Sequence, residues 1–213
     1  MSKEKKIARF DPNGVGLRTG SFIGLPFDEE EAEVVLLSIP WDVTASYGEG
    51  ASGAPQNILR ASSQLDLYDP FIEDAWKMGI YMRPPEEMLV EKNRELRSKA
   101  RSYIDFLESG GRPEDKPAMQ SRLQDINRGC EEMVAEVWKH SLQLMAEGKL
   151  VGLIGGDHSC PLGFLQALEE RGEKFGVLQI DAHMDLRQAY EGFTYSHASI
   201  FYNALRLSAV EKL

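Results

Sequence analysis

Two short apolar runs in the second half of the chain, Leu150–Ile154 and Phe175–Ile180, constrain its fold more than any other feature. Ionisable residues follow both runs closely: Asp157 and His158 after the first, and the segment Asp181–Asp185 (DAHMD) after the second. Continuous apolar runs of this length are typical of strands that are buried on both faces of a parallel sheet. The carboxyl ends of such strands meet at one edge of the sheet, where α/β proteins bind their ligands. The sequence therefore predicts two neighbouring strands that hold a functional site.

Strands and helices alternate along the chain, which predicts an α/β fold of three layers with a mostly parallel central sheet. Residues 1–213 are expected to form a single domain, in which residues 1–33 are an N-terminal arm with little regular structure. Apolar residues three and four apart indicate the helices. The remaining strands are expected over Val34–Ile39 and Lys77–Met82. Two long helices are expected over Glu86–Glu108 and Ala118–Glu147. Three further helices are expected: one with Pro55 in its first turn, one from Cys160 with Ser159 as its N-cap, and one around Ala198–Leu205.

The composition excludes several classes of protein. A formal net charge of −10 argues against a nucleic-acid partner, and no apolar stretch is long enough to cross a membrane. The acidic surface favours a cationic small molecule modestly, although a merely solvated surface explains it as well. The N-terminus lacks the apolar run of a signal peptide. Two cysteines, Cys130 and Cys160, suggest no disulfide framework, so a reducing cytoplasm is expected.

The strongest chemical signal is the alternation of Asp181, His183 and Asp185 after the second apolar run. If the backbone remains extended, residues two apart face the same side, and all three side chains converge. A parallel neighbouring strand brings His158 to the same edge of the sheet. A donor set of carboxylate oxygens and imidazole favours a divalent ion of the manganese type over an all-thiolate zinc site.

Other residues near these motifs admit a functional and a structural interpretation. Asp157 is a candidate for orienting a ligand histidine rather than binding the metal. Cys160 is a candidate ligand or nucleophile, but its place in the first turn of a helix favours packing. His140 lies in a helical pattern and is interpreted as a surface or capping residue. The Gly-rich loop of residues 41–53 lacks both phosphate-binding patterns, so a flexible loop at the mouth of a site is favoured over a phosphate cradle.

The motifs GGDHS, at residues 155–159, and DAHMD, at residues 181–185, resemble those of the ureohydrolases, the arginase and agmatinase family of binuclear manganese enzymes. Their order and their places after consecutive apolar runs make the resemblance specific. It is closest in style to the agmatinases. Weaker similarity is carried by three further segments: IPWD at residues 39–42, GAPQNILRAS at residues 53–62, and YSHAS at residues 195–199, where agmatinases have Ser-His-Gly.

The resemblance implies a metal-dependent hydrolase of linear amidines that contains two Mn2+ ions. It assigns His158 and Asp185 to one ion, His183 to the other, and Asp181 to a position that bridges both. A hydroxide shared by the two ions attacks the guanidinium carbon and releases urea and an amine. Asp185 accepts the hydrogen bond of that hydroxide, and His197 delivers a proton to the departing amine.

The family pattern contains motifs that have no counterpart in the residues up to Leu213. The family completes its site with a later Ser-x-Asp-x-Asp-x-x-Asp-Pro motif and a glutamate, so the fold is expected to lack the family's C-terminal part. Two explanations are open: a truncated ureohydrolase, or a shortened, non-catalytic subunit for binding or assembly. The helical stretch over residues 84–117 is interpreted as a possible insertion.

The resemblance also bears on the substrate and the assembly. The segment RQAYEGFTYSHAS, at residues 187–199, lacks the Asn-rich element with which arginases hold an amino-acid substrate. A cationic guanidino compound such as agmatine is therefore favoured, while guanidinobutyrate, guanidine and formiminoglutamate remain open. Family members commonly form homo-oligomers, and the same is expected for this chain.

Overall fold

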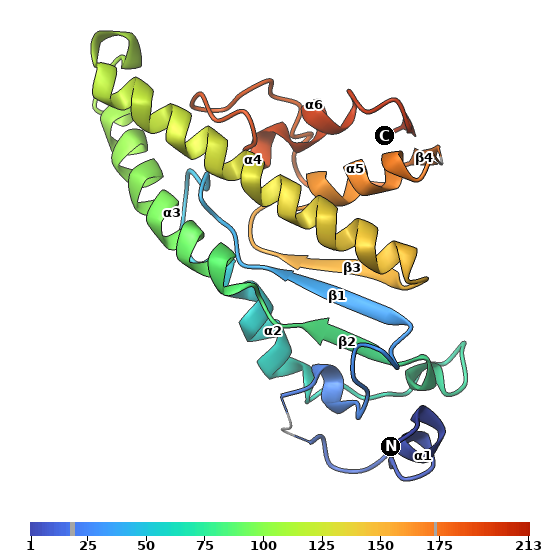
Figure 1. Cartoon of the computed structure of the whole chain (residues 1–213). Helices are drawn as coiled ribbons and strands as arrows, with labels where there is room; N and C mark the ends of the chain where they lie inside the picture. Colours follow the sequence, from blue (N-terminus) through green and yellow to red (C-terminus); the bar gives the residue numbers. More distant parts are fainter. Residues whose placement is uncertain (18–19, 173) are drawn as a thin grey trace.

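A three-stranded parallel sheet forms the centre of the molecule (Figure 1). The structure is a computed structural model that describes residues 1–17, 20–172 and 174–213. The sheet has the order β2–β1–β3, with β1 (Val34–Ile39) between β2 (Ile80–Arg83) and β3 (Leu150–Gly155). Val34 pairs with Ile80 on one side and with Leu150 on the other. The predicted α/β class and parallel sheet are confirmed.

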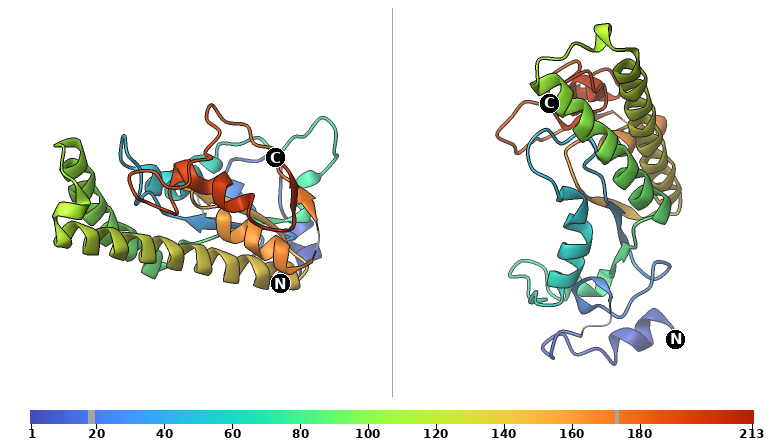
Figure 2. Two further views of the ribbon diagram at one scale, coloured as in Figure 1. Left: turned by 90° about the horizontal axis from the view of Figure 1, so that it is seen from above. Right: turned by 90° about the vertical axis from the view of Figure 1, so that its left-hand side faces the viewer.

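Helices cover both faces of the sheet (Figure 2). The long helices α3 and α4 form a hairpin, and α4 packs with α5 on one face while α2 lies on the other (Figure 2). Both long helices lie within one residue of their predicted bounds. The helices among the described residues are α1 (Lys3–Ile7), α2 (Ala54–Ser62), α3 (Glu87–Glu108), α4 (Pro117–Ala146), α5 (Leu162–Glu170) and α6 (Ile200–Ala204).

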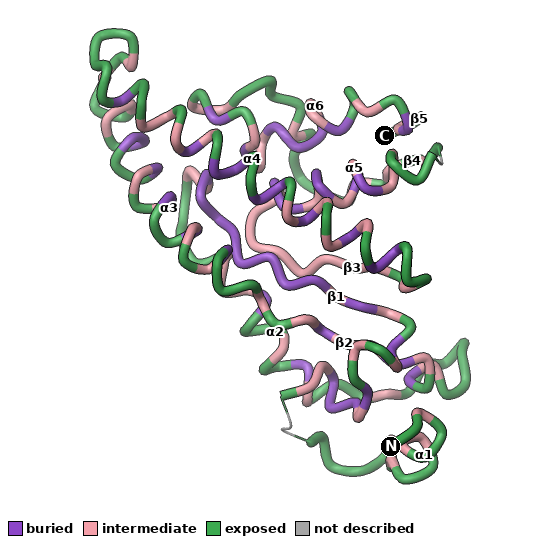
Figure 3. The backbone as a smooth tube through the Cα atoms, in the orientation of Figure 1, coloured by how far each residue is buried: buried purple, intermediate pink, exposed green. Residues whose placement is uncertain are grey.

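The main core lies between β1 and the α3–α4 hairpin. Most of β1 is buried, as Figure 3 shows, because neighbours on both edges and both faces enclose it. Apolar side chains spaced three and four residues apart on α4 face the sheet and are almost fully buried, among them Ile126, Met133 and Val137. The continuous apolar run of Val34–Ile39 is thus explained by burial on all sides.

The predicted strand Phe175–Ile180 is wrong in its extent. It is hydrogen-bonded as a strand only over Phe175–Gly176 (β4), which pairs in parallel with β5 (Val210–Lys212) in a separate two-stranded sheet. Leu178 and Ile180 are 87% and 92% exposed. A buried strand needs neighbours on both edges, and the described part of the chain supplies β4 with one and β3 with β1 alone.

The other differences are smaller. The strand expected over Lys77–Met82 is the later β2, because Ala75–Met78 forms a single 3-10 turn. The helix expected from Cys160 begins at Leu162, and Ser159 does not cap it. The α6 helix is a short one preceded by a 3-10 turn over His197–Ser199.

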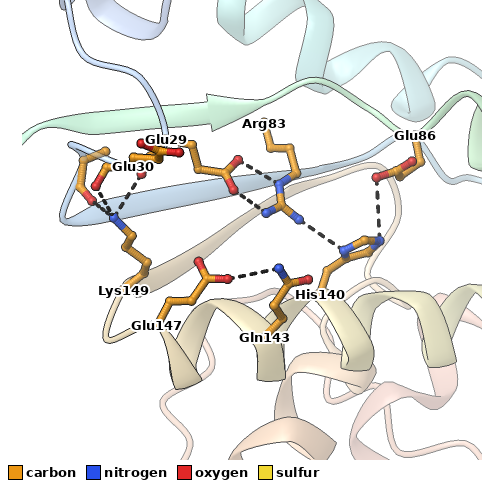
Figure 4. Close-up of polar contacts among 9 residues, drawn as sticks. Glu29, Glu30, Arg83, Glu86, His140, Gln143, Glu147 and Lys149 are labelled. Carbon is orange, nitrogen blue, oxygen red and sulfur yellow. Dashed lines mark hydrogen bonds and ion pairs between the residues drawn. The ribbon is translucent and has the colours of Figure 1, made fainter. Parts of the chain in front are cut away.

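The N-terminal arm is fixed to the sheet by a polar network (Figure 4). Arg83, at the end of β2, donates to both carboxylate oxygens of Glu29 and to Nδ1 of His140 at 3.1 Å. On the other edge of the network, the ammonium group of Lys149 donates to three carbonyl oxygens of the arm. His140 is therefore a half-buried member of a network, and its interpretation as a surface or capping residue is wrong.

Candidate metal centre

The chain leaves β3 through a close backbone contact at Gly156. The N–H of Asp157 donates to the carbonyl of Trp41 at 2.8 Å, so the end of β3 rests on the segment that follows β1. A Cβ atom at position 156 would lie 1.9 Å from the Trp41 carbonyl oxygen. Only glycine fits there, and the contact places His158 at the carboxyl edge of the sheet.

Three side chains form a compact group at this edge: His158, Asp181 and Asp185. Nδ1 of His158 lies 2.7 Å from a carboxylate oxygen of Asp185 and 3.0 Å from one of Asp181. One ligand atom from each residue lies within 4.8 Å of the others, and Asp185 is the least exposed of the three side chains, at 10%. One imidazole nitrogen and two carboxylate oxygens in such a small volume suit a single divalent ion.

The backbone of the DAHMD motif bends instead of remaining extended. A carboxylate oxygen of Asp181 accepts the N–H of His183 at 2.9 Å, which turns the chain, and Asp185 adopts a left-handed conformation with φ of 49°. Aspartate tolerates that conformation better than most residues. The bend directs Asp181 and Asp185 to His158 and leaves His183 outside, with its side chain 82% exposed and Nδ1 3.8 Å from Asp181. The expected convergence of all three side chains on an extended backbone is wrong.

The Asp181 carboxylate is suited to bind a cation. The hydrogen bond from the His183 backbone, with help from the nearby His158, holds the pKa of Asp181 below its ordinary value. Asp181 is therefore ionised at neutral pH, the form in which a carboxylate binds metal. The ring of His158 is held edge-on against Phe201, with centroids 5.4 Å apart.

His197 lies beside this group but is not one of its members. The N–H of Phe201 donates to the Asp185 carbonyl at 3.1 Å, which brings the segment that contains His197 to the site. The His197 ring packs edge-on against Tyr190 at 6.0 Å. Its Nδ1 atom is buried and has no hydrogen-bond partner among the residues that the structure describes. In the described part of the chain, no hydrogen bond joins His197 to His158, Asp181 or Asp185.

Asp157 and Cys160 are directed inward. One carboxylate oxygen of Asp157 accepts the backbone N–H and the hydroxyl of Ser159, and burial raises the pKa of this carboxyl although those bonds act to lower it. Cys160 is 1% exposed, and burial raises the pKa of its thiol well above the ordinary value. Its thiol is therefore protonated at neutral pH, which favours packing over a nucleophilic role.

Sequence reasoning missed the residues that support the site from α3 and from the loop after β1. Thr44 lies with its hydroxyl 3.5 Å from the second carboxylate oxygen of Asp157. Asn93 is 8% exposed although it is polar and occupies the apolar face of α3, beside Leu89 and Leu96. A polar residue on an apolar helical face was the available signal, because such a side chain needs a buried hydrogen-bond partner.

Comparison with known sequences identifies the family of this chain. A sequence model of the arginase family matches residues 32–212. The chain belongs to the arginase family. It is 30% identical over 180 residues to N(1)-aminopropylagmatine ureohydrolase of Synechocystis, a match that covers 83% of this chain and 48% of that protein. It is 27% identical to agmatinase of Bacillus anthracis, with 80% of this chain and 46% of that protein covered.

Solved structures of the arginase family share the fold. Agmatine ureohydrolase of Thermoplasma volcanium superposes with a TM-score of 0.58 at 22% identity, covering 96% of this chain and 54% of that one. Arginase from Medicago truncatula gives a TM-score of 0.52 at 22% identity, covering 86% and 49%. The chain spans about half the length of the curated relatives it matches. Of the helices described, none combines the length and apolarity that a bilayer crossing needs.

Proposed function

We propose that this chain carries a divalent-metal site of a ureohydrolase that acts on a cationic guanidino compound and releases urea and an amine. The observation that carries the proposal is the group of His158, Asp181 and Asp185 at the carboxyl end of β3, in a chain of the arginase family. Its donor set fits one divalent ion, for which we propose Mn2+. When bound, such an ion lowers the pKa of water so that a nucleophile forms at neutral pH.

Each side chain has a proposed task. His158, Asp181 and Asp185 would hold the first ion, and Asp181 would also contribute to holding a second. Asp185 also accepts the proton of the attacking nucleophile. His197 donates a proton to the amine that leaves, a task suited to an imidazole.

The second ion requires more than the group supplies. His183 is the proposed ligand, but its side chain is 82% exposed, and its Nδ1 atom lies 3.8 Å from a carboxylate oxygen of Asp181. Full binuclear activity therefore requires further ligands. The alternative function is a non-catalytic subunit for binding or assembly. The expectations of a homo-oligomer and a cytoplasmic location remain predictions.

The substrate proposal is based on the substrates for which the similar proteins are named. Those quoted above are named for agmatine and for N(1)-aminopropylagmatine, which both present a guanidinium group on an aliphatic chain without a carboxylate. We propose that class for this chain, with agmatine as the first compound to test. Guanidinobutyrate and formiminoglutamate, which carry a carboxylate, are the contrasting substrates.

The test combines metal binding with product analysis on the purified chain. Mn2+ binding is measured by calorimetry, and urea release is measured with agmatine, N(1)-aminopropylagmatine, arginine and guanidinobutyrate. We expect at least one ion per chain, lost in His158→Ala and retained in His140→Gln, a half-buried histidine outside the group. Metal binding without urea from any compound supports the non-catalytic alternative. Failure to bind Mn2+ and to form urea refutes the enzyme proposal for this chain.

A further inference from the structure

One face of α3 holds the segment that follows β1. Asn93 and Asp42 bond reciprocally: the Asn93 side-chain oxygen accepts the Asp42 N–H at 2.8 Å, and its amide nitrogen donates to the Asp42 carboxylate at 3.1 Å. One turn further along the same face, Arg97 donates to the carbonyl oxygens of Val43 at 3.1 Å and Ala45 at 2.5 Å. Two polar side chains of a helix therefore bind three residues of the segment Asp42–Ala45.

The same carboxylate closes the Gly-rich loop. The second oxygen of Asp42 accepts the N–H groups of Gly50 at 3.0 Å and Ser52 at 3.1 Å, while Asp42 itself is only 2% exposed. The middle of the loop projects into solvent, where Tyr47 is 98% exposed. Asp42 thus joins the two ends of the loop, and Asn93 holds Asp42.

The held segment is also the support of the metal centre. Trp41, just before it, accepts the N–H of Asp157, and Thr44, within it, contacts the carboxylate of Asp157. Asp157 in turn is bonded to Ser159, so the turn that presents His158 is fixed from both sides. A continuous series of contacts therefore joins α3 to the metal-binding histidine.

We propose that Asn93 and Arg97 of α3 are positioning residues of the metal centre, which act by fixing the segment Asp42–Ala45 against the Asp157–His158 turn. The metal-binding part of this inference rests on the proposed function, whereas the hold on the loop does not. A buried amide and a largely buried guanidinium are costly unless they are hydrogen-bonded. Here both direct their bonds to one loop, although the apolar face of α3 could be completed by leucine.

Hydrogen exchange measured residue by residue, together with Mn2+ calorimetry on the full chain, tests the inference. The variants are Asn93→Ala and Arg97→Lys, since the shorter lysine side chain does not reach the position from which Nη1 of Arg97 donates to both carbonyls. The control is Lys99→Ala on the same helix, which removes only an exposed ion pair with Glu95. Exchange in the core of α4, at Ile126 and Met133, reports whether the fold is intact.

In Asn93→Ala we expect the amides of Gly50 and Ser52 to exchange at least about tenfold faster and Mn2+ to bind about tenfold more weakly, as is typical when the support of a metal ligand is removed. Arg97→Lys should show the same change to a smaller degree, and Lys99→Ala should match the wild type in both. If loop exchange or Mn2+ affinity remains within twofold of the wild type while α4 stays protected, the inference is overturned.

The proposed function and the role of α3 can be refuted independently. If the wild-type chain binds no Mn2+, the proposed function and the metal-positioning part of this inference are both refuted. Faster loop exchange in Asn93→Ala then still supports the hold of α3 on the loop, because that measurement requires no metal. If Asn93→Ala does not fold, Arg97→Lys decides the outcome, since it retains the charge and most of the packing volume.

Discussion

The contact between Gly156 and Trp41 gives the most quantitative prediction, for the substitution Gly156→Ala. The added Cβ would lie 1.9 Å from the Trp41 carbonyl oxygen and 2.7 Å from its carbonyl carbon, whereas ordinary contact begins at 3.4 Å. Both neighbours are backbone atoms, so no side chain can rotate to make room. The end of β3 must instead move away from the segment that follows β1.

The cost has two parts. Forcing an extra methyl group into a packed interior costs about 1–3 kcal/mol. The same movement breaks the 2.8 Å bond from the Asp157 N–H to the Trp41 carbonyl, which contributes about 1 kcal/mol. The sum of about 2–4 kcal/mol is a large part of the roughly 5–15 kcal/mol that stabilises a typical domain.

Urea unfolding measures this loss. With a slope of about 2 kcal/mol/M, the midpoint of Gly156→Ala should fall by about 1–2 M. Gly53→Ala is the matched control, because position 53 has a φ of −80° and a Cβ there meets only the Asn57 side chain, at 3.7 Å. We expect that control to be neutral or slightly stabilising. An unchanged midpoint for Gly156→Ala would show that the close approach described for this turn does not exist in solution.

Three further predictions concern ionisable groups. Desolvation, together with the Arg83 guanidinium, holds the pKa of His140 below its ordinary value. As the pH drops below about 6.5, the His140 imidazole is therefore protonated in the unfolded chain before it is protonated in the folded one, and the free energy of unfolding falls. His140→Gln should reduce the loss of stability in urea between pH 7.5 and 5.5, and an unaltered loss would contradict the assignment. Although desolvation acts to raise it, hydrogen bonds from the loop and α3 hold the pKa of Asp42 below its ordinary value. Its contribution is therefore complete above about pH 4 and is lost at lower pH, so the deficit of Asp42→Ala in urea unfolding should shrink between pH 7 and pH 3. Burial raises the pKa of the thiols of Cys130 and Cys160, so neither should react with a thiol reagent until the chain unfolds in urea; rapid labelling of the native protein would be inconsistent with their burial.

The local sequence pattern predicted a strand correctly where that strand is enclosed by protein on all sides. The run Val34–Ile39 predicted β1 with the bounds that the structure shows, because every residue of a central strand faces protein. The run Phe175–Ile180 looks the same in sequence, yet only two of its residues pair as a strand, since pairing depends on neighbours that a local pattern does not reveal.

The site shows the same division. The two motifs were enough to anticipate that His158 lies near Asp181 and Asp185, although among the described residues β3 and β4 belong to separate sheets. The sequence did not predict the position of His183. The backbone N–H of His183 donates to the Asp181 carboxylate, and this bond bends the chain. The hold of α3 on Asp42 was also missed, as it joins residues about fifty positions apart.

The central place of β1 has a kinetic consequence. Val34 cannot pair with Leu150 until the intervening chain, including both long helices, has been brought back across the sheet. Parallel pairing between distant segments is slow to form, because the entropy of loop closure is lost before any contact compensates for it. The α3–α4 hairpin needs only local contacts and should form first. Refolding should therefore show early helical signal and a later, slower step in which the sheet, and with it the metal centre, is assembled.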